Sequence, residues 1–299
     1  MTFEAFVQGF GCVPNPTPYE QARAVVLPTP LEPGGSEIPG VGLGPLAVLG
    51  ASRFVETYDG ELGFDPLEAG VATLDALRLR YDTLERPYEQ IESAVREVLH
   101  HGKLPLCVGG ERTIALGAAR ACRAVHGEVG VVLFTRRPGL CDEAEGRRIA
   151  PSTIGRRLSE EHPCCFLGAR TWTEEEARSL SSRDAPPVAT ARSLEDGQTL
   201  PDECTRALPR KVHLSIDVGV LDPAVLPIPG NIEPGGLRWF SLTSLIDQVF
   251  DTFEVVACDV SGFAPALGDL APGVLVAELV LRCLGRGLES SQRAVGSTP

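Results

Sequence analysis

The feature that most constrains the fold is a repeated alternation of short apolar segments with segments of helical periodicity. The apolar segments are short, and the one at residues 129–134 is rich in β-branched residues, as buried strands are. They lie at residues 104–108, 129–134, 164–168, 212–218 and 254–260. Helices are expected between and after them, at residues 85–101, 117–125 and 241–251 and from Pro272 onward. This order predicts an α/β fold, a three-layer α/β/α sandwich around a mostly parallel sheet.

Two helices carry more specific signals. In residues 85–101, Ile91 and Val95 begin an apolar stripe at helical spacing, and Gly102 ends it. Further along, Thr173 and Glu176 have the spacing of a capping box, in which each residue satisfies a backbone N–H of the other. The second pattern predicts a helix that starts just after Thr173.

The composition along the chain favours one domain. Residues 1–45 are rich in Pro and Gly and are expected to form an irregular N-terminal arm. Residues 46–288 are expected to form the α/β domain, with a polar surface loop at residues 180–203. Residues 289–299 are expected to be a disordered tail.

Charge and cysteine content exclude several classes of protein. The formal net charge of −13 disfavours nucleic acid and anionic membranes as partners. No apolar run is long enough to span a membrane, and the N-terminus lacks the pattern of a secretory signal, so we expect a cytoplasmic protein. The nine cysteines form no Cys-x-x-Cys pair, and we expect neither a disulfide framework nor a zinc site.

Four segments directly after expected strands contain the candidate functional residues. They read GGERT at 109–113, TRRPG at 135–139, DVGVLDP at 217–223 and DVSGFAP at 259–265. Ligands of parallel sheets bind outside the carboxyl ends of the strands. The four segments therefore define the expected site.

Taken together, these segments resemble the ureohydrolases, the family of arginase and agmatinase. Residues 109–113 stand where the family has Gly-Gly-(Asp/Glu)-His-Ser, and residues 135–139 where it has Asp-Ala-His-x-Asp. Residues 215–223 are similar to the family's Ser-x-Asp-x-Asp-x-x-Asp-Pro. Residues 55–77 and 167–176 also agree, so the likeness covers nearly the whole chain and implies an arginase-like fold.

The resemblance also implies where a family member would hold two Mn²⁺ ions and its substrate. The six metal-ligand positions correspond to Arg112, Thr135, Arg137, Gly139, Asp217 and Gly219, and two substrate positions to Pro151 and Gly262. Asp217 alone is still a metal ligand, since arginine offers no lone pair and glycine no side chain. A degenerate site is therefore expected, with no catalytic residue and no cofactor.

A buried Asp217 without a cation would be costly, so we expect a charged partner for it. Arg112 or Arg137 could pair with it in a bidentate fork. The group formed by Arg112, Arg136, Arg137 and Asp217 is thus a candidate either for replacing the metal charge or for binding an anion.

Three functions remain open at this point. The leading hypothesis is a non-catalytic homologue, a structural or regulatory subunit of an agmatinase-like oligomer, formed with copies of itself or with an active ureohydrolase paralogue. The second is an active agmatinase-type amidinohydrolase that releases urea from a guanidino substrate. The third is a sensor of an anionic small molecule in the cleft.

Overall fold

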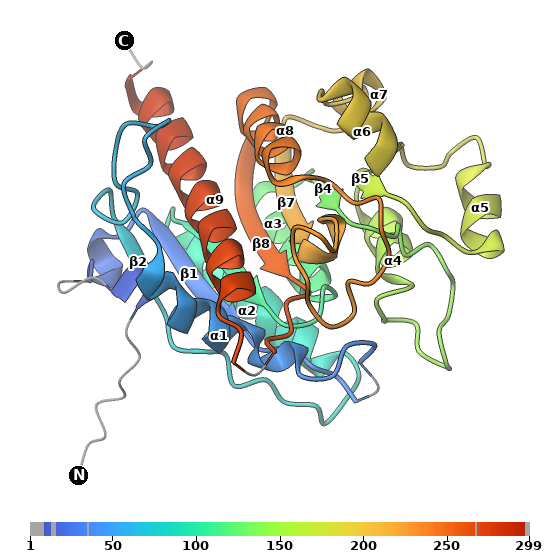
Figure 1. Ribbon diagram of the computed structural model, residues 1–299, viewed down its shortest axis with the longest axis horizontal. Helices are drawn as coiled ribbons and strands as arrows, with labels where there is room; N and C mark the ends of the chain where they lie inside the picture. Colours follow the sequence, from blue (N-terminus) through green and yellow to red (C-terminus); the bar gives the residue numbers. More distant parts are fainter. Residues whose placement is uncertain (1–8, 13–15, 35, 267, 297–299) are drawn as a thin grey trace.

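A single eight-stranded parallel sheet runs through the molecule (Figure 1). The computed structural model describes residues 9–12, 16–34, 36–266 and 268–296. In these residues the strands are β1 (Ala24–Thr29), β2 (Val71–Thr73), β3 (Leu104–Gly109), β4 (Gly130–Phe134), β5 (Cys164–Ala169), β6 (Val188–Thr190), β7 (Lys211–Asp217) and β8 (Glu254–Ser261). Their order across the sheet is β2-β1-β3-β8-β7-β4-β5-β6. The predicted α/β class and parallel sheet are confirmed.

Helices cover both faces of this sheet. The α-helices are α1 (Gly44–Ala51), α2 (Arg86–His100), α3 (Ile114–His126), α4 (Ile154–Glu161), α5 (Glu174–Leu180), α6 (Ala191–Gly197), α7 (Asp202–Ala207), α8 (Trp239–Thr252) and α9 (Ala271–Gly296). Apolar residues of α1, α8 and α9 pack on one face, and those of α2, α3 and α4 pack on the other. In Figure 1, α8 and α9 lie in front of the strands and α2 and α3 behind them.

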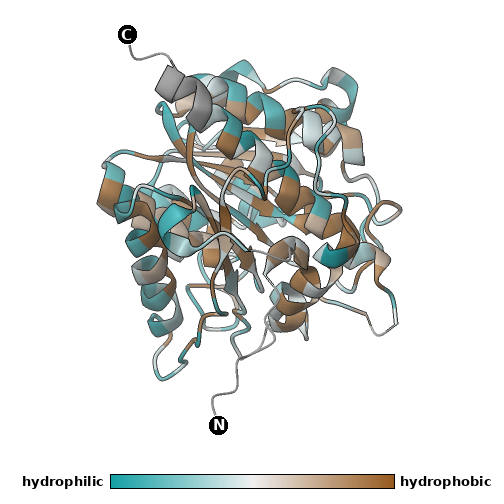
Figure 2. Cartoon of the chain, turned by 90° about the vertical axis from the view of Figure 1, so that its left-hand side faces the viewer, coloured by the Kyte–Doolittle hydropathy of each residue, from teal (hydrophilic) through white to brown (hydrophobic). Residues whose placement is uncertain are grey.

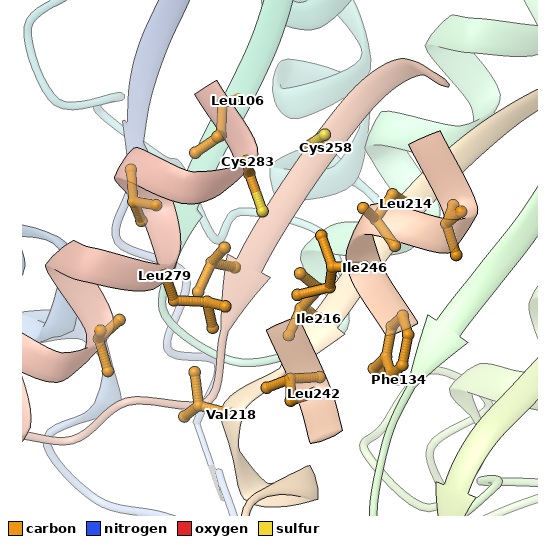
Figure 3. Packing of buried hydrophobic residues seen from close by; sticks show 14 of the residues in the cluster. Leu106, Phe134, Leu214, Ile216, Val218, Leu242, Ile246, Cys258, Leu279 and Cys283 are labelled. Carbon is orange, nitrogen blue, oxygen red and sulfur yellow. The ribbon is translucent and has the colours of Figure 1, made fainter. Parts of the chain in front are cut away.

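The core consists of two apolar layers separated by the sheet. Along β8, Cys258 and Val260 belong to one layer, whereas Val256 and Ala257 belong mainly to the other. Figure 3 shows apolar side chains of α8 and α9 packed against β7 and β8. The strands are hydrophobic along most of their length and the outer surfaces of the helices carry hydrophilic residues (Figure 2). This burial of apolar surface is the main stabilising contribution.

The two specific helix predictions are confirmed. Helix α2 spans Arg86–His100 and buries Ile91 and Val95. Helix α5 begins with the capping box, in which the Thr173 side chain accepts from the Glu176 backbone N–H and the Glu176 side chain accepts from the Thr173 backbone N–H. The bond from the Thr173 backbone N–H holds the fully buried Glu176 at the edge of the site described below.

Three expectations about irregular segments need correction. The N-terminal 45 residues contain β1, a fully buried strand between β2 and β3. The sequence did not predict this strand because prolines surround its apolar run. Residues 180–203 contain β6, α6 and the start of α7. The expected tail at 289–299 continues α9 as far as Gly296. Residues 1–8, 13–15, 35 and 297–299 of these segments lie outside the described residues.

The cysteine expectation also needs correction, since Cys165 of β5 forms a disulfide with Cys204 of α7. The two residues are 39 positions apart in sequence, and the return of α7 onto β5 brings their Cα atoms within 5.5 Å. Sequence spacing alone carries no signal for such a pair. Six other cysteines are buried free thiols, namely Cys107, Cys122, Cys141, Cys164, Cys258 and Cys283.

Across the part of the chain that the structure describes, no helix is long and apolar enough to cross a membrane. The longest helix among the described residues, α9, has 26 residues, and charged side chains such as Glu278, Arg282 and Arg286 interrupt its apolar sequence.

Candidate functional site

The four segments singled out in the sequence meet at the carboxyl ends of β3, β4, β7 and β8. They enclose a cleft with about 550 Å³ of space not occupied by atoms, including the part open to solvent. Its lining includes most of the predicted positions, namely Arg112, Arg136, Arg137, Pro151, Asp217, Gly219 and Gly262. Thr135 and Gly139 lie directly beneath this lining, against Arg112.

The guanidinium of Arg112 is the centre of the hydrogen-bond network at the floor of the cleft. Its Nε donates to the Pro151 carbonyl at 3.1 Å, and its Nη1 donates to the Arg137 carbonyl at 2.9 Å. Nη1 also contacts the Thr135 hydroxyl, and Nη2 contacts the Pro151 carbonyl. These bonds connect the segments after β3 and β4 with the loop at Pro151, so the arginine holds three chain segments together.

Arg112 also forms an ion pair with Asp217, the last residue of β7. Nη1 lies 3.4 Å from Oδ2, so the contact uses one nitrogen and is not the bidentate fork that was expected. The Asp217 carboxylate also accepts hydrogen bonds from the Gly219 N–H at 3.0 Å and from the Thr135 hydroxyl at 3.3 Å. Burial lowers the pKa of Arg112 while Asp217 raises it, and the guanidinium stays protonated.

Two glycines make room for this pair. Gly139 has φ of +75°, and a Cβ there would lie 2.7 Å from Nη2 of Arg112. Gly262 has φ of +85°, and a Cβ there would lie 2.5 Å from Oδ1 of Asp217. Both positions therefore need glycine for backbone conformation and for space.

The two arginines of the TRRPG segment, Arg136 and Arg137, each pair with a different carboxylate. Nη1 of Arg136 lies 2.9 Å from Glu233, and Nε of Arg137 lies 2.9 Å from Glu176. Glu176 also accepts the backbone N–H groups of Gly139 and Leu140. Burial opposes ionisation of Glu176, but its backbone hydrogen bonds and Arg137 outweigh it and lower its pKa.

Two further carboxylates line the cleft. Glu111 is 4% exposed and accepts hydroxyl hydrogen bonds from Ser36 and Thr113, both at 2.8 Å. Glu37 is exposed and also lines the cleft. Among the described residues, neither carboxylate forms an ion pair with a basic side chain. Burial raises the pKa of Glu111, and its two hydroxyl donors partly offset this.

The structure brings all nine sequence-predicted positions to one place. The sequence did not identify the acidic residues that complete the site. The sequence indicated Glu176 only as part of a capping box, and it contained Glu111 within GGERT without indicating a role for it. Glu37 and Glu233 carried no local signal, because they reach the cleft from loops at positions 36–41 and 230–236.

Known proteins resemble this chain in sequence and in fold. The chain is 30% identical to N(1)-aminopropylagmatine ureohydrolase from Thermus thermophilus over 92% of its length and 94% of the relative. Its fold matches agmatine ureohydrolase of Thermoplasma volcanium with a TM-score of 0.83, at 24% identity and 97% coverage of both chains. It also matches Trypanosoma cruzi formiminoglutamase with a TM-score of 0.77, at 21% identity, covering 90% of this chain and 94% of that one.

Two expectations are overturned by these comparisons. The expected non-catalytic subunit is contradicted because the relatives that match along nearly their whole length are named for ureohydrolase activity. This favours the active alternative. The expectation of no cofactor is contradicted because the T. cruzi relative was solved with Mn²⁺.

The donor set of this chain nevertheless differs from that of a two-metal site. In residues 9–12, 16–34, 36–266 and 268–296, no group of three or more His, Cys, Asp or Glu side chains could hold a metal ion. Asp217 is the one carboxylate among the six ligand positions, and it already accepts from Arg112. These residues do not fit a pair of manganese ions, so no reaction step is assigned to a metal.

The family itself follows from the extent of the match. The model of the arginase family covers residues 22–285, from just before β1 to within α9. All the strands and the whole cleft lie inside this range. The chain belongs to the arginase family.

Proposed function

We propose that this chain takes a cationic guanidino compound into the strand-end cleft and acts on it as an amidine hydrolase of the agmatinase type. The observation that carries the proposal is the distribution of charge in the cleft. Its three arginines are each paired with a carboxylate, and two carboxylates are left over.

The pairing can be followed residue by residue. Arg112 faces Asp217, while Arg136 and Arg137 face Glu233 and Glu176. Glu37 and Glu111 line the same cleft without an ion-pair partner among the described residues. Since opposite charges compensate each other within such short distances, the cleft retains an excess of negative charge.

This excess favours a cation over the anion that the arginines alone suggested. An anion would have to displace Glu176 or Glu233 from its arginine, or approach two carboxylates that form no ion pair among the described residues. A guanidinium or ammonium group meets neither obstacle, and both form strong charge-assisted hydrogen bonds with carboxylates. The relatives named for aminopropylagmatine and agmatine independently support a substrate of this chemistry.

The test is urea release from agmatine and from N(1)-aminopropylagmatine by the purified chain. Reactions with and without added Mn²⁺, together with elemental analysis of the protein, separate the activity of the chain from the effect of a metal. We expect urea from at least one of the two compounds, and its loss in Asp217→Asn, provided that circular dichroism shows this variant folded.

Two results would contradict the proposal. Absence of urea under all metal conditions would contradict the hydrolase, and absence of calorimetric binding of both compounds would contradict the ligand class. A matched control is Glu68→Gln, which removes one charge from an exposed side chain outside the cleft lining and is expected to change neither measurement.

A further inference from the structure

We propose that Glu111 and Glu37 form an ammonium subsite, so that the cleft selects guanidino compounds with a second positive charge over those with a neutral or anionic tail. This inference rests on the proposed function and concerns the opposite end of the ligand from its guanidino group. Among the described residues that line the cleft, these two are the carboxylates left without an ion-pair partner.

The wall that carries the two residues is fixed by hydrogen bonds. The carboxylate of Glu32 accepts the backbone N–H groups of Gly40 and Gly42, both at 2.8 Å. The Ser36 hydroxyl donates to Oε2 of Glu111 at 2.8 Å. The segment at 36–42 is therefore held against the start of the chain after β3, and Glu37 is placed next to Glu111 at the cleft.

Glu111 has the acceptor capacity that the subsite requires. Thr113 donates to Oε1 and Ser36 to Oε2, so each oxygen has one donor. An ionised carboxylate offers about four lone-pair positions, which leaves room for further donors. Because the Glu111 side chain is held on both oxygens, little side-chain entropy is lost when an ammonium group binds.

The floor of the cleft does not offer an equivalent partner. The Asp217 carboxylate already accepts from Arg112, Thr135 and the Gly219 N–H. The nearby carboxylates Glu176 and Glu233 are engaged by arginines. An ammonium group is therefore expected to bind most strongly at the wall formed by Glu37 and Glu111.

The test compares ligands that differ only in the tail. Agmatine carries an ammonium group, butylguanidine ends in a methyl group, and 4-guanidinobutyrate ends in a carboxylate. Calorimetry with the wild-type chain is expected to give agmatine at least tenfold tighter binding than butylguanidine, with 4-guanidinobutyrate weakest. Ten-fold corresponds to about 1.4 kcal/mol, the size of one charge-assisted contact.

Two variants locate the effect. Glu37→Gln changes an exposed side chain, and Glu111→Gln keeps the shape of a buried one, so both are expected to fold. Each should weaken agmatine binding severalfold and leave butylguanidine binding unchanged. The control Glu68→Gln should leave both unchanged.

The possible outcomes separate the inference from the proposed function. Equal binding of agmatine and butylguanidine, or equal weakening of both by the variants, overturns the ammonium subsite and leaves the guanidino ligand class standing. Tighter binding of 4-guanidinobutyrate than of agmatine overturns it as well. If no guanidino compound binds, both the proposed function and the ammonium subsite are contradicted.

Discussion

The guanidinium of Arg112 faces the carboxylate of Asp217 at the floor of the cleft, with Nη1 3.4 Å from Oδ2 and both side chains less than a tenth exposed. Arg112 comes directly after β3 and Asp217 ends β7, strands separated by β8 in the sheet. The pair thus connects two strand ends that have no backbone hydrogen bonds with each other.

Asp217→Asn should lower the free energy of unfolding by about 3 kcal/mol, because it leaves a buried guanidinium without its compensating charge. Asparagine can still accept the Gly219 N–H, so the effect reports mainly the lost charge. Urea denaturation followed by circular dichroism measures it, with Glu68→Gln as the control. A shift within experimental error would mean that the pair contributes nothing.

Gly139→Ala should destabilise the protein more than Gly146→Ala. The two glycines have nearly the same φ, +75° and +76°, but a Cβ at Gly146 meets nothing within 4 Å, whereas one at Gly139 would lie 2.7 Å from Arg112. The backbone cost of about 1 kcal/mol is common to both. The excess at Gly139, of about 1–3 kcal/mol, reports the crowding of a Cβ against Arg112 and against the Pro151 carbonyl, which would lie 2.8 Å away.

Equal losses in the two alanine variants would contradict this reading of Gly139. Urea denaturation at neutral pH gives both values from the same type of experiment, so backbone strain cancels in the comparison.

Glu176→Gln should remove an acid-dependent part of the stability. Burial opposes the ionised form of Glu176, but the Thr173 backbone N–H and Arg137 lower its pKa below the usual 4.5. A carboxyl group with a lowered pKa stabilises the fold above its unfolded pKa, and this contribution is lost as the pH falls through the folded value. The substitution should therefore cost about 2 kcal/mol at pH 7 and progressively less in acid.

This pH dependence is checked by measuring the free energy of unfolding of the wild type and of Glu176→Gln from pH 7 to pH 3. The two curves should converge at low pH. Parallel curves would show that the ionisation of Glu176 is not linked to folding.

Reduction of the disulfide between Cys165 and Cys204 should destabilise the chain. For a loop of 39 residues, the loss of the cross-link in the unfolded state corresponds to about 4 kcal/mol in the chain-entropy model. Denaturation with and without a phosphine reductant measures the change, and a Cys165→Ala, Cys204→Ala double variant should not respond to the reductant.

Mass spectrometry provides a separate check of the same cross-link. Alkylation of the denatured, unreduced chain should leave the two cross-linked residues, Cys165 and Cys204, unmodified. Modification of all nine would show that the disulfide does not form.

The sequence was most informative where a local pattern is itself the structural cause. The capping box at Thr173 and Glu176 and the apolar stripe of α2 depend on residues three or four positions apart, and both were predicted. The convergence of Arg112, Arg137 and Asp217 was also predictable, because parallel strands place their carboxyl ends at one edge.

The sequence was least informative where the cause is a contact between distant segments. The disulfide, the partner of Arg136 and the position of Glu37 depend on how loops return to the sheet, which no local pattern encodes. An anionic ligand was among the functions left open for the same reason. Arg136 and Arg137 suggested an anion until the structure placed Glu233 and Glu176 against them.

The most direct test of the central claim is a calorimetric comparison of agmatine with succinate as ligands of the wild-type chain at pH 7. Our account predicts saturable binding of agmatine, one molecule per chain, and no measurable binding of the dicarboxylate, because the arginines of the cleft are already paired. Saturable binding of succinate without binding of agmatine would contradict it.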